Sequence, residues 1–291
     1  MTPTRTTSET PSIPAPVTTG RVLITSGGGM TARRIAPLLW DGDRAVRLAS
    51  RTTTPPLDWA DPSTYAAALE GVDAAWIAYQ PDLVAPGAPE AIGAFTDAAV
   101  RAGVRRLVIL SGRGEPAARE CEDIVRASGL EWTALRCSLF AQNFGEGHLL
   151  GPILDGVVAI PVPDVPEPFV DVDDVAEAAV VALTQPGHAG RAYEITGPRA
   201  LTFAEATAAI GAASGRPVRA LSVTPAEYEE ALAGAGLPAG YAAMLTGLFT
   251  EVLDGRNRVP QDGVQALLGR PPRDFADYVR HTAATGMWSA S

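Results

Sequence analysis

Short apolar runs alternate with segments of helical periodicity along the first half of the chain. The runs have the length of buried strands, and the segments between them space apolar residues three and four positions apart. The predicted strands cover residues 22–25, 45–50, 72–79, 106–111 and 131–136. The predicted helices cover residues 30–40, a segment that Asp61 and Pro62 begin, 89–102 with Gly103 at its end, and 115–128 with Gly129 at its end.

This alternation predicts an α/β fold of the Rossmann type, in which helices cover both faces of a doubly wound parallel sheet. We expect residues 21–140 to form this dinucleotide-binding domain and the segment 165–190 to return to it. Ligands of such sheets bind at the carboxyl ends of the strands. The loops that follow those ends therefore carry the candidate site.

The pattern changes after Phe140. Residues 141–168 are rich in Gly and Pro and are predicted to be mostly irregular, and the remainder is mainly helical. Further helices are predicted over residues 173–183, 202–213, 225–233, 241–253 and 273–284. We expect residues 141–164 and 191–291 to form a smaller, mostly helical C-terminal lobe that covers the substrate.

The first twenty residues carry neither pattern. They are rich in Thr, Pro and Ser and lack an apolar segment, so we interpret residues 1–20 as a disordered tail and not as a signal peptide. Elsewhere no stretch approaches the roughly 18 to 20 apolar residues of a membrane helix. The sequence thus predicts a soluble, cytoplasmic protein, either a monomer or a homodimer.

Charge and composition narrow the partners to small molecules. The net charge of −10 disfavours nucleic acid and anionic membrane surfaces, since both are bound mainly through Lys and Arg. Cys121 and Cys137 form no CxxC pair, and the three histidines lie far apart, so we expect no metal site. The chain contains no lysine at all, which excludes a P-loop lysine, a Schiff base and a Tyr-x-x-x-Lys proton relay.

A glycine-rich turn follows the first predicted strand and opens the first helix. Residues 27–32, Gly-Gly-Gly-Met-Thr-Ala, fit the G-x-G-x-x-A form of the dinucleotide fingerprint. Missing side chains allow close approach of a pyrophosphate, and the helix N-terminus offers free N–H groups. The predicted cofactor-binding residues of this turn are Thr25, Ser26, Gly27, Gly28, Gly29, Met30 and Thr31.

The second predicted strand indicates which dinucleotide is bound. An NAD site usually places a carboxylate at its end, whereas this strand ends in Ser50, Arg51 and Thr52. A guanidinium can pair bidentately with a 2′-phosphate. We therefore expect NADP(H) to be preferred over NAD(H), with Arg51 on the phosphate.

Several blocks of sequence, in order, resemble the NmrA-like branch of the atypical short-chain dehydrogenases, which includes ergot alkaloid festuclavine dehydrogenases and NADPH-dependent quinone and azo reductases. The blocks are the strand and turn at 22–29, residues 48–52, Leu57-Asp58-Trp59, 103–111, 132–136, Asn143-Phe144, 168–176 and 193–198. The resemblance covers nearly everything after Arg21. It is specific for the family and less so for the reaction.

The resemblance implies roles for residues beyond the turn. Asp58 and Trp59 would flank the adenine, while Tyr79, Gln80 and Pro81 would lie beside the ribose of the nicotinamide, near Ser111. The residues implied to line the nicotinamide or the substrate are Cys137, Ser138, Phe140, Asn143 and Phe144.

The chain also departs from the family pattern. Relatives often read Thr-Gly-Ala-Thr-Gly at the turn, whereas Ser26 takes the first glycine position here and Ala32 a later one. Cys137 follows Arg136 where relatives commonly have proline, and Ala118 aligns with a lysine that some relatives use as acid or base. These changes bear on the proton relay more than on cofactor binding.

Three residues are candidates for catalysis. Ser111 could donate a hydrogen bond to a developing oxyanion or simply end its strand. Tyr79 could donate a proton, although packing on the cofactor explains it better, and Cys137 could be reactive or a small buried apolar residue. Glu115, by contrast, is interpreted as an acid that complements a helix dipole, and Asp171, Asp173 and Asp174 as caps of a helix.

Three functions are compatible with these residues. The favoured one is an NADPH-dependent reductase that transfers hydride to a small conjugated, quinone- or iminium-type substrate. The second is a non-catalytic NADP(H)-binding redox sensor that acts through a protein partner. The third is a non-redox cyclase or isomerase on the same fold.

Overall fold

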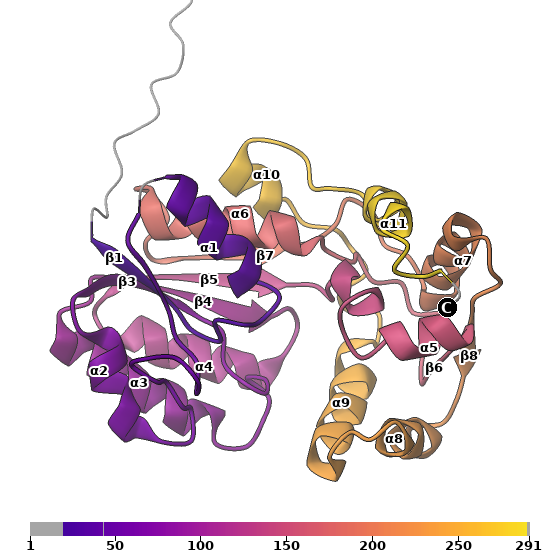
Figure 1. Cartoon of the computed structure of the whole chain (residues 1–291), viewed down its shortest axis with the longest axis horizontal. Helices are drawn as coiled ribbons and strands as arrows, with labels where there is room; N and C mark the ends of the chain where they lie inside the picture. The colour runs from indigo at the N-terminus through magenta and orange to yellow at the C-terminus, as the bar shows by residue number, and fades with distance from the viewer. Residues whose placement is uncertain (1–19, 43, 290–291) are drawn as a thin grey trace, which may run out of the picture.

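A six-stranded parallel sheet forms the centre of the molecule (Figure 1). The structure is a computed structural model that describes residues 20–42 and 44–289. In sheet order the strands are β2 (Val46–Leu48), β1 (Arg21–Ile24), β3 (Val72–Ile77), β4 (Arg106–Gly112), β5 (Glu131–Cys137) and β7 (Arg191–Ile195). Every neighbouring pair is parallel. The predicted α/β fold of the Rossmann type is therefore confirmed.

Helices cover both faces of this sheet. One face carries α1 (Ala32–Asp41), α6 (Val172–Thr184) and α10 (Gly263–Leu268), and the other carries α2 (Tyr65–Leu69), α3 (Ala88–Ala102) and α4 (Pro116–Ala127) (Figure 1). Alternation along a strand divides the two cores: in β1, Val22 and Ile24 point into one core and Leu23 into the other. A fully apolar strand is thus needed where both faces are covered.

The smaller lobe has a core of its own beside the carboxyl ends of the strands. It contains η2 (Ala141–Phe144), α5 (Leu150–Asp155), β6 (Val157–Ile160), α7 (Phe203–Ser214), β8 (Arg219–Ser222), α8 (Pro225–Gly234), α9 (Ala239–Val252) and α11 (Phe275–Ala284). β6 and β8 pair in parallel as a separate two-stranded sheet. Within the described part of the chain, no helix has the length and apolar character that would let it cross a membrane.

The boundary expected at residue 191 was wrong. Residues 191–195 form β7, which extends the main sheet beside β5, and α10 packs against α6. The segment expected to be irregular holds α5 and β6, and β8 was not predicted either. These strands are only four or five residues long, and β7 and β8 lack a continuous apolar run, so their pairing depends on distant partners. Residues 1–19 of the expected tail lie outside the described residues.

The local end signals read from the sequence are confirmed. Asp61 accepts a hydrogen bond from the Ser63 amide at the start of η1 (Pro62–Thr64), and Gly103 ends α3 with φ of 76°. Asp171 caps α6 by accepting from the Asp173 amide. The capping role predicted for the aspartates at 171, 173 and 174 does not, however, apply to Asp174.

Asp174 is fully buried and joins α6 to the segment before α11. It forms ion pairs with Arg270 and Arg273 and accepts the backbone N–H of Arg273 at 2.7 Å. Glu177, one turn further along α6, binds the same two guanidinium groups. A buried carboxylate satisfied in this way locks the C-terminal segment against the Rossmann domain.

Replacing Asp174 tests this anchor. Asp174→Ala leaves two guanidinium groups short of a partner, so we expect the free energy of unfolding in urea to fall by about 2–4 kcal/mol. Asp173→Ala is the matched control, since that neighbour is half exposed and forms only a surface pair with Arg34. Its loss should remain below about 1 kcal/mol. Equal losses for the two variants would contradict the assignment.

Candidate functional site

Two adjoining cavities open at the carboxyl ends of the strands. The outer cavity, of about 670 Å³, lies beside β2, and the inner cavity, of about 300 Å³, lies between the sheet and α9. Residues that line both are Ser26, Gly29, Tyr79, Gln80 and Pro81. The two cavities therefore meet at the glycine turn after β1 and the loop after β3.

Hydroxyl groups hold this turn against β3. Thr25 accepts the Ala78 amide at 2.8 Å through Oγ1, and Ser26 donates to the Ala78 carbonyl oxygen at 2.7 Å. Ser26 adopts φ of 52°, the left-handed conformation that glycine adopts most readily. A Cβ at Gly29 would lie 3.1 Å from the Ser26 carbonyl oxygen, so the turn has little room there.

The outer cavity presents polar groups around an aromatic wall. Arg51 is exposed, and its guanidinium makes no hydrogen bond or ion pair with the described residues. Asp58 and Trp59 line the same cavity. The Trp59 ring packs on Tyr79 with centroids 5.1 Å apart and on Phe95 at 5.2 Å. A free cation beside a fixed aromatic surface suits a phosphorylated adenosine.

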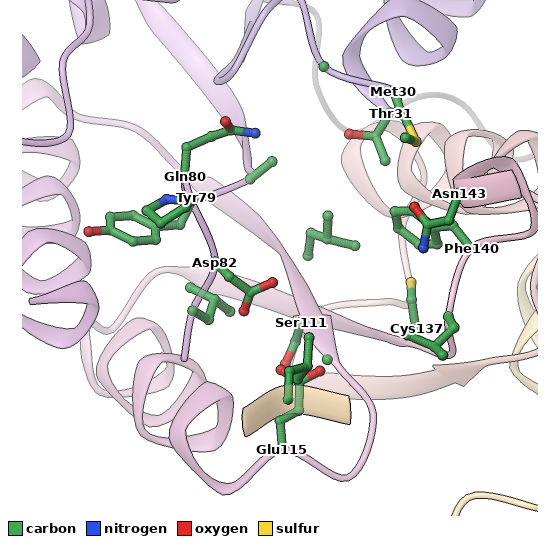
Figure 2. Close-up of a pocket in the computed structure, with 18 of the residues that line it drawn as sticks. Met30, Thr31, Tyr79, Gln80, Asp82, Ser111, Glu115, Cys137, Phe140 and Asn143 are labelled. Carbon is green, nitrogen blue, oxygen red and sulfur yellow. The ribbon is translucent and has the colours of Figure 1, made fainter. Parts of the chain in front are cut away.

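The inner cavity joins the Rossmann domain to the lobe. Met30 and Thr31 lie on one side with Phe140 and Asn143, while Ser111 and Cys137 lie at the carboxyl ends of β4 and β5 (Figure 2). α9 adds Tyr241, Leu245, Leu248 and Phe249. The lobe therefore covers this cavity, and its use as a substrate pocket stays a prediction.

His148 also lines the inner cavity, next to α9. Its ring meets Phe249 edge-on at 5.9 Å, and its Nε2 has no hydrogen-bond partner among the described residues. Burial lowers the pKa of His148 to about 4, so the ring is neutral at physiological pH. No group of three or more His, Cys, Asp or Glu residues within the described ranges is arranged to hold a metal ion.

The three catalytic candidates differ in their hydrogen bonds and in the effect of burial on their pKa values. The Ser111 hydroxyl donates to Glu122 at 2.6 Å, so its proton points away from any substrate oxyanion. Burial raises the pKa of the Cys137 thiol, which keeps it neutral. Burial also raises the pKa of Tyr79, whose ring packs on Trp59 as described above.

Not every predicted site residue faces a cavity. Thr25 is fully buried and bonds only within the protein, and Gly27 packs against β2, where an added Cβ would lie 3.0 Å from that of Leu48. Both position the turn. Phe144 was expected in the substrate pocket, but it is fully buried in the aromatic core of the lobe against Phe169. The η2 turn places Asn143 on the cavity and Phe144 on its opposite side.

Two carboxyl groups in the inner cavity were missed by the sequence analysis. Asp82 belongs to the loop after β3, and Glu115 stands at the start of α4 without capping it (Figure 2). Burial raises the pKa of Asp82, and burial together with repulsion from Asp82 raises that of Glu115 to about 8. Their positions in the loops that follow β3 and β4 were the available signal. Glu115 had instead been interpreted as a partner of the helix dipole.

The chain is similar in sequence to several named reductases over most of its length. The NAD(P)H azoreductase of Xenophilus azovorans is 32% identical, over 86% of this chain and 90% of the relative. An agroclavine dehydrogenase of Claviceps fusiformis is 30% identical over 89% and 96%. The (4-alkanoyl-5-oxo-2,5-dihydrofuran-3-yl)methyl phosphate reductase of Streptomyces griseus is 35% identical over 88% and 96%.

Solved structures show the same fold. The NADPH-dependent quinone oxidoreductase QOR2 of Escherichia coli, complexed with NADPH, has a TM-score of 0.77 at 23% identity and covers 89% of this chain and 99% of its own. The negative transcriptional regulator NmrA gives 0.69 at 18%, with coverage of 93% and 97%. No family model matches the chain.

The identities and the near-complete coverage of the named relatives decide the family. The chain is an NmrA-like atypical short-chain dehydrogenase/reductase. The resemblance inferred from the sequence blocks is thereby confirmed. Within this NmrA-like protein, the glycine turn and the two cavities are the candidate site.

The serine of the turn gives a direct test of its geometry. In Ser26→Ala the left-handed backbone loses its hydrogen bond to Ala78, so unfolding in urea should require about 1 kcal/mol less. Ser26→Gly loses the same bond but relieves the strain, and should stay within about 0.5 kcal/mol of the unmodified protein. If the alanine variant is as stable as the glycine variant, the hydroxyl does not support this turn.

Proposed function

We propose that this protein is an NADPH-dependent reductase that transfers hydride to a small, flat, conjugated acceptor such as a quinone or an iminium ion. The observation that carries the proposal is the meeting of two cavities at one glycine turn. A dinucleotide has two halves joined by a pyrophosphate, and this arrangement offers a place for each half. The named reductases in the family support the same reading.

The residues present fit a dinucleotide. Gly28 and Gly29 leave the start of α1 open for the pyrophosphate, and nothing lies within 4 Å of a Cβ built at Gly28. Asp58 and Trp59 would hold the adenosine, with Tyr79 and Gln80 at the junction of the cavities. NADPH supplies the hydride when bound. The nicotinamide would lie in the inner cavity, where Phe140 and Asn143 orient the acceptor and α9 excludes water.

The preference for NADP(H) rests on Arg51. Its guanidinium lies in the wall of the outer cavity and has no other partner among the described residues, so a 2′-phosphate would meet a free cation. Most other arginines near the site are engaged in ion pairs, as Arg34 is with Glu146.

Charge restricts the acceptor. No arginine is among the described residues that line the inner cavity, and its two carboxyl groups are Asp82 and Glu115. An anionic group would therefore enter without a counter-charge. The cavity favours uncharged or cationic acceptors over a phosphate ester of the kind named for the Streptomyces griseus relative.

Calorimetric titration with NADPH, NADP⁺ and NADH tests the proposal. We expect NADPH and NADP⁺ to bind comparably and NADH at least tenfold more weakly, a difference of about 1.4 kcal/mol. Quinones and iminium ions are then screened for NADPH oxidation. Failure to bind any dinucleotide would sink the proposal. A strong preference for one redox state without turnover would favour the sensor.

Substitution of Arg51 checks the cofactor preference. Arg51→Ala should lower the affinity for NADPH at least tenfold and leave that for NADH within about twofold, because only NADPH carries the 2′-phosphate. Arg119→Ala is the control: it removes an exposed arginine that lines neither cavity. A parallel loss for both dinucleotides would assign Arg51 a merely structural role.

A further inference from the structure

The loop between β4 and α4 directs an acid into the inner cavity. Glu115 is 9% exposed, and its side chain folds back over Gly112, where an added Cβ would lie 1.9 Å from the carboxyl group. No hydrogen-bond donor of the described residues reaches that carboxyl. Figure 2 shows Glu115 together with Ser111 and Asp82 among the residues that line this cavity.

Nearby arginines do not neutralise Glu115. Arg113 is buried, but its guanidinium pairs with Glu194 at 2.8 Å and donates to the carbonyl oxygens of Asn257 and Val259. The Asn257 amide donates to the Arg113 carbonyl oxygen in return. The loop is thus clamped from the lobe, while its only cation faces away from the cavity.

A second buried glutamate in this region, Glu122, differs from Glu115 in having hydrogen-bond donors for its carboxyl group. Glu122 accepts the Ser111 hydroxyl and a bidentate contact from Arg136 at 2.6–3.0 Å. These donors satisfy both oxygens of the Glu122 carboxyl group. Glu115 has none of them, although both lie near the end of β4.

The groups that face Glu115 are acidic or neutral. Asp82 and Glu251 of α9 repel its negative form, while Cys137 lies close enough for Glu115 to raise the thiol's pKa. His148 is neutral, and Tyr241 keeps its proton because burial and Asp82 raise its pKa. The pKa of Glu115, at about 8 against an ordinary 4.5, follows from this environment.

We propose that Glu115 is the proton donor for the reduction of uncharged acceptors, with Asp82 as the positioning residue that keeps it protonated. The inference rests on the proposed function. In a conjugated carbonyl acceptor, a C–H bond forms with the hydride from NADPH and the electron pair of the π system moves to oxygen. The Glu115 O–H bond breaks as the new O–H bond forms. Glu115 is left as a carboxylate, which solvent reprotonates.

The choice of acceptor separates this role from a structural one. A neutral enone or quinone needs a hydride and a proton, whereas a preformed iminium ion needs only the hydride. Glu115→Gln should lower kcat/KM about 100-fold for the neutral acceptor, mainly through kcat, and less than threefold for the iminium ion. Glu120→Gln, an exposed change on α4 outside both cavities, should alter neither. Equal losses with both acceptors, or no loss, would overturn the assignment.

The pH dependence of kcat/KM provides a second test of the donor role. With the neutral acceptor, kcat/KM should fall as the pH rises above about 8, because ionised Glu115 has no proton to donate. Asp82→Asn removes a repelling charge, so this decline should move to lower pH. A decline that stays in place would exclude Asp82 from the role.

Thermal unfolding without cofactor gives a readout independent of turnover. Between pH 4.5 and about 8 the folded protein keeps a proton on Glu115 that the unfolded chain has lost. Stability therefore falls as the pH rises through this window. The Tm of Glu115→Gln relative to the unmodified protein should rise from pH 5 to 8 and then level off, and a flat difference would contradict the protonated state.

Together these experiments distinguish a failure of the proposed function from a failure of the donor role of Glu115. If the unmodified protein binds no NADPH, the proposed function and the donor role fall together. If it binds NADPH and reduces acceptors while Glu115→Gln keeps the same ratio of rates for the two acceptors, only the donor role falls.

Discussion

The attachment of the glycine turn to Ala78 is the contact on which the site depends. Thr25 and Ser26 both bind this one residue, at the point where β3 ends. The turn after β1 and the loop after β3 are thereby held side by side, and these two segments supply every residue shared by the cavities. Ser26 thus holds a backbone conformation that favours glycine, and its hydrogen bond to Ala78 compensates the cost of that conformation.

Much of the Rossmann domain could be predicted from local sequence, since its strands are continuous apolar runs and its helices carry end signals such as Gly103 and Asp61. The order of the strands and the family resemblance predicted Arg51 and Trp59 at one site, and both line the outer cavity. β7 was not predicted, because a short edge strand such as 191–195 is defined by its partner. Phe144 was misplaced for a similar reason: neighbours along a turn face opposite ways.

The position of Asp82 and Glu115 in the inner cavity could not be predicted from local sequence. An acidic residue at the start of a helix usually serves the helix dipole, which is why Glu115 was interpreted so. Its actual surroundings come from β3, β5 and α9, and the clamp through Arg113 and Asn257 joins positions far apart in the chain. The arginines near the inner cavity depend on distant partners too: Arg113 and Arg136 bind Glu194 and Glu122, and no arginine is among the described residues that line this cavity.

The acceptors proposed for this protein are electrophiles, which can modify the pocket that binds them. Quinones and enones alkylate amines and thiolates, and the chain contains no lysine, while the thiol in the cavity, Cys137, is held in its unreactive neutral form. His148 also lines this cavity, with its ring edge-on to Phe249. The inner cavity therefore presents neither a lysine amine nor a thiolate to an electrophilic ligand, so under the proposed function the protein would resist alkylation by its own substrate.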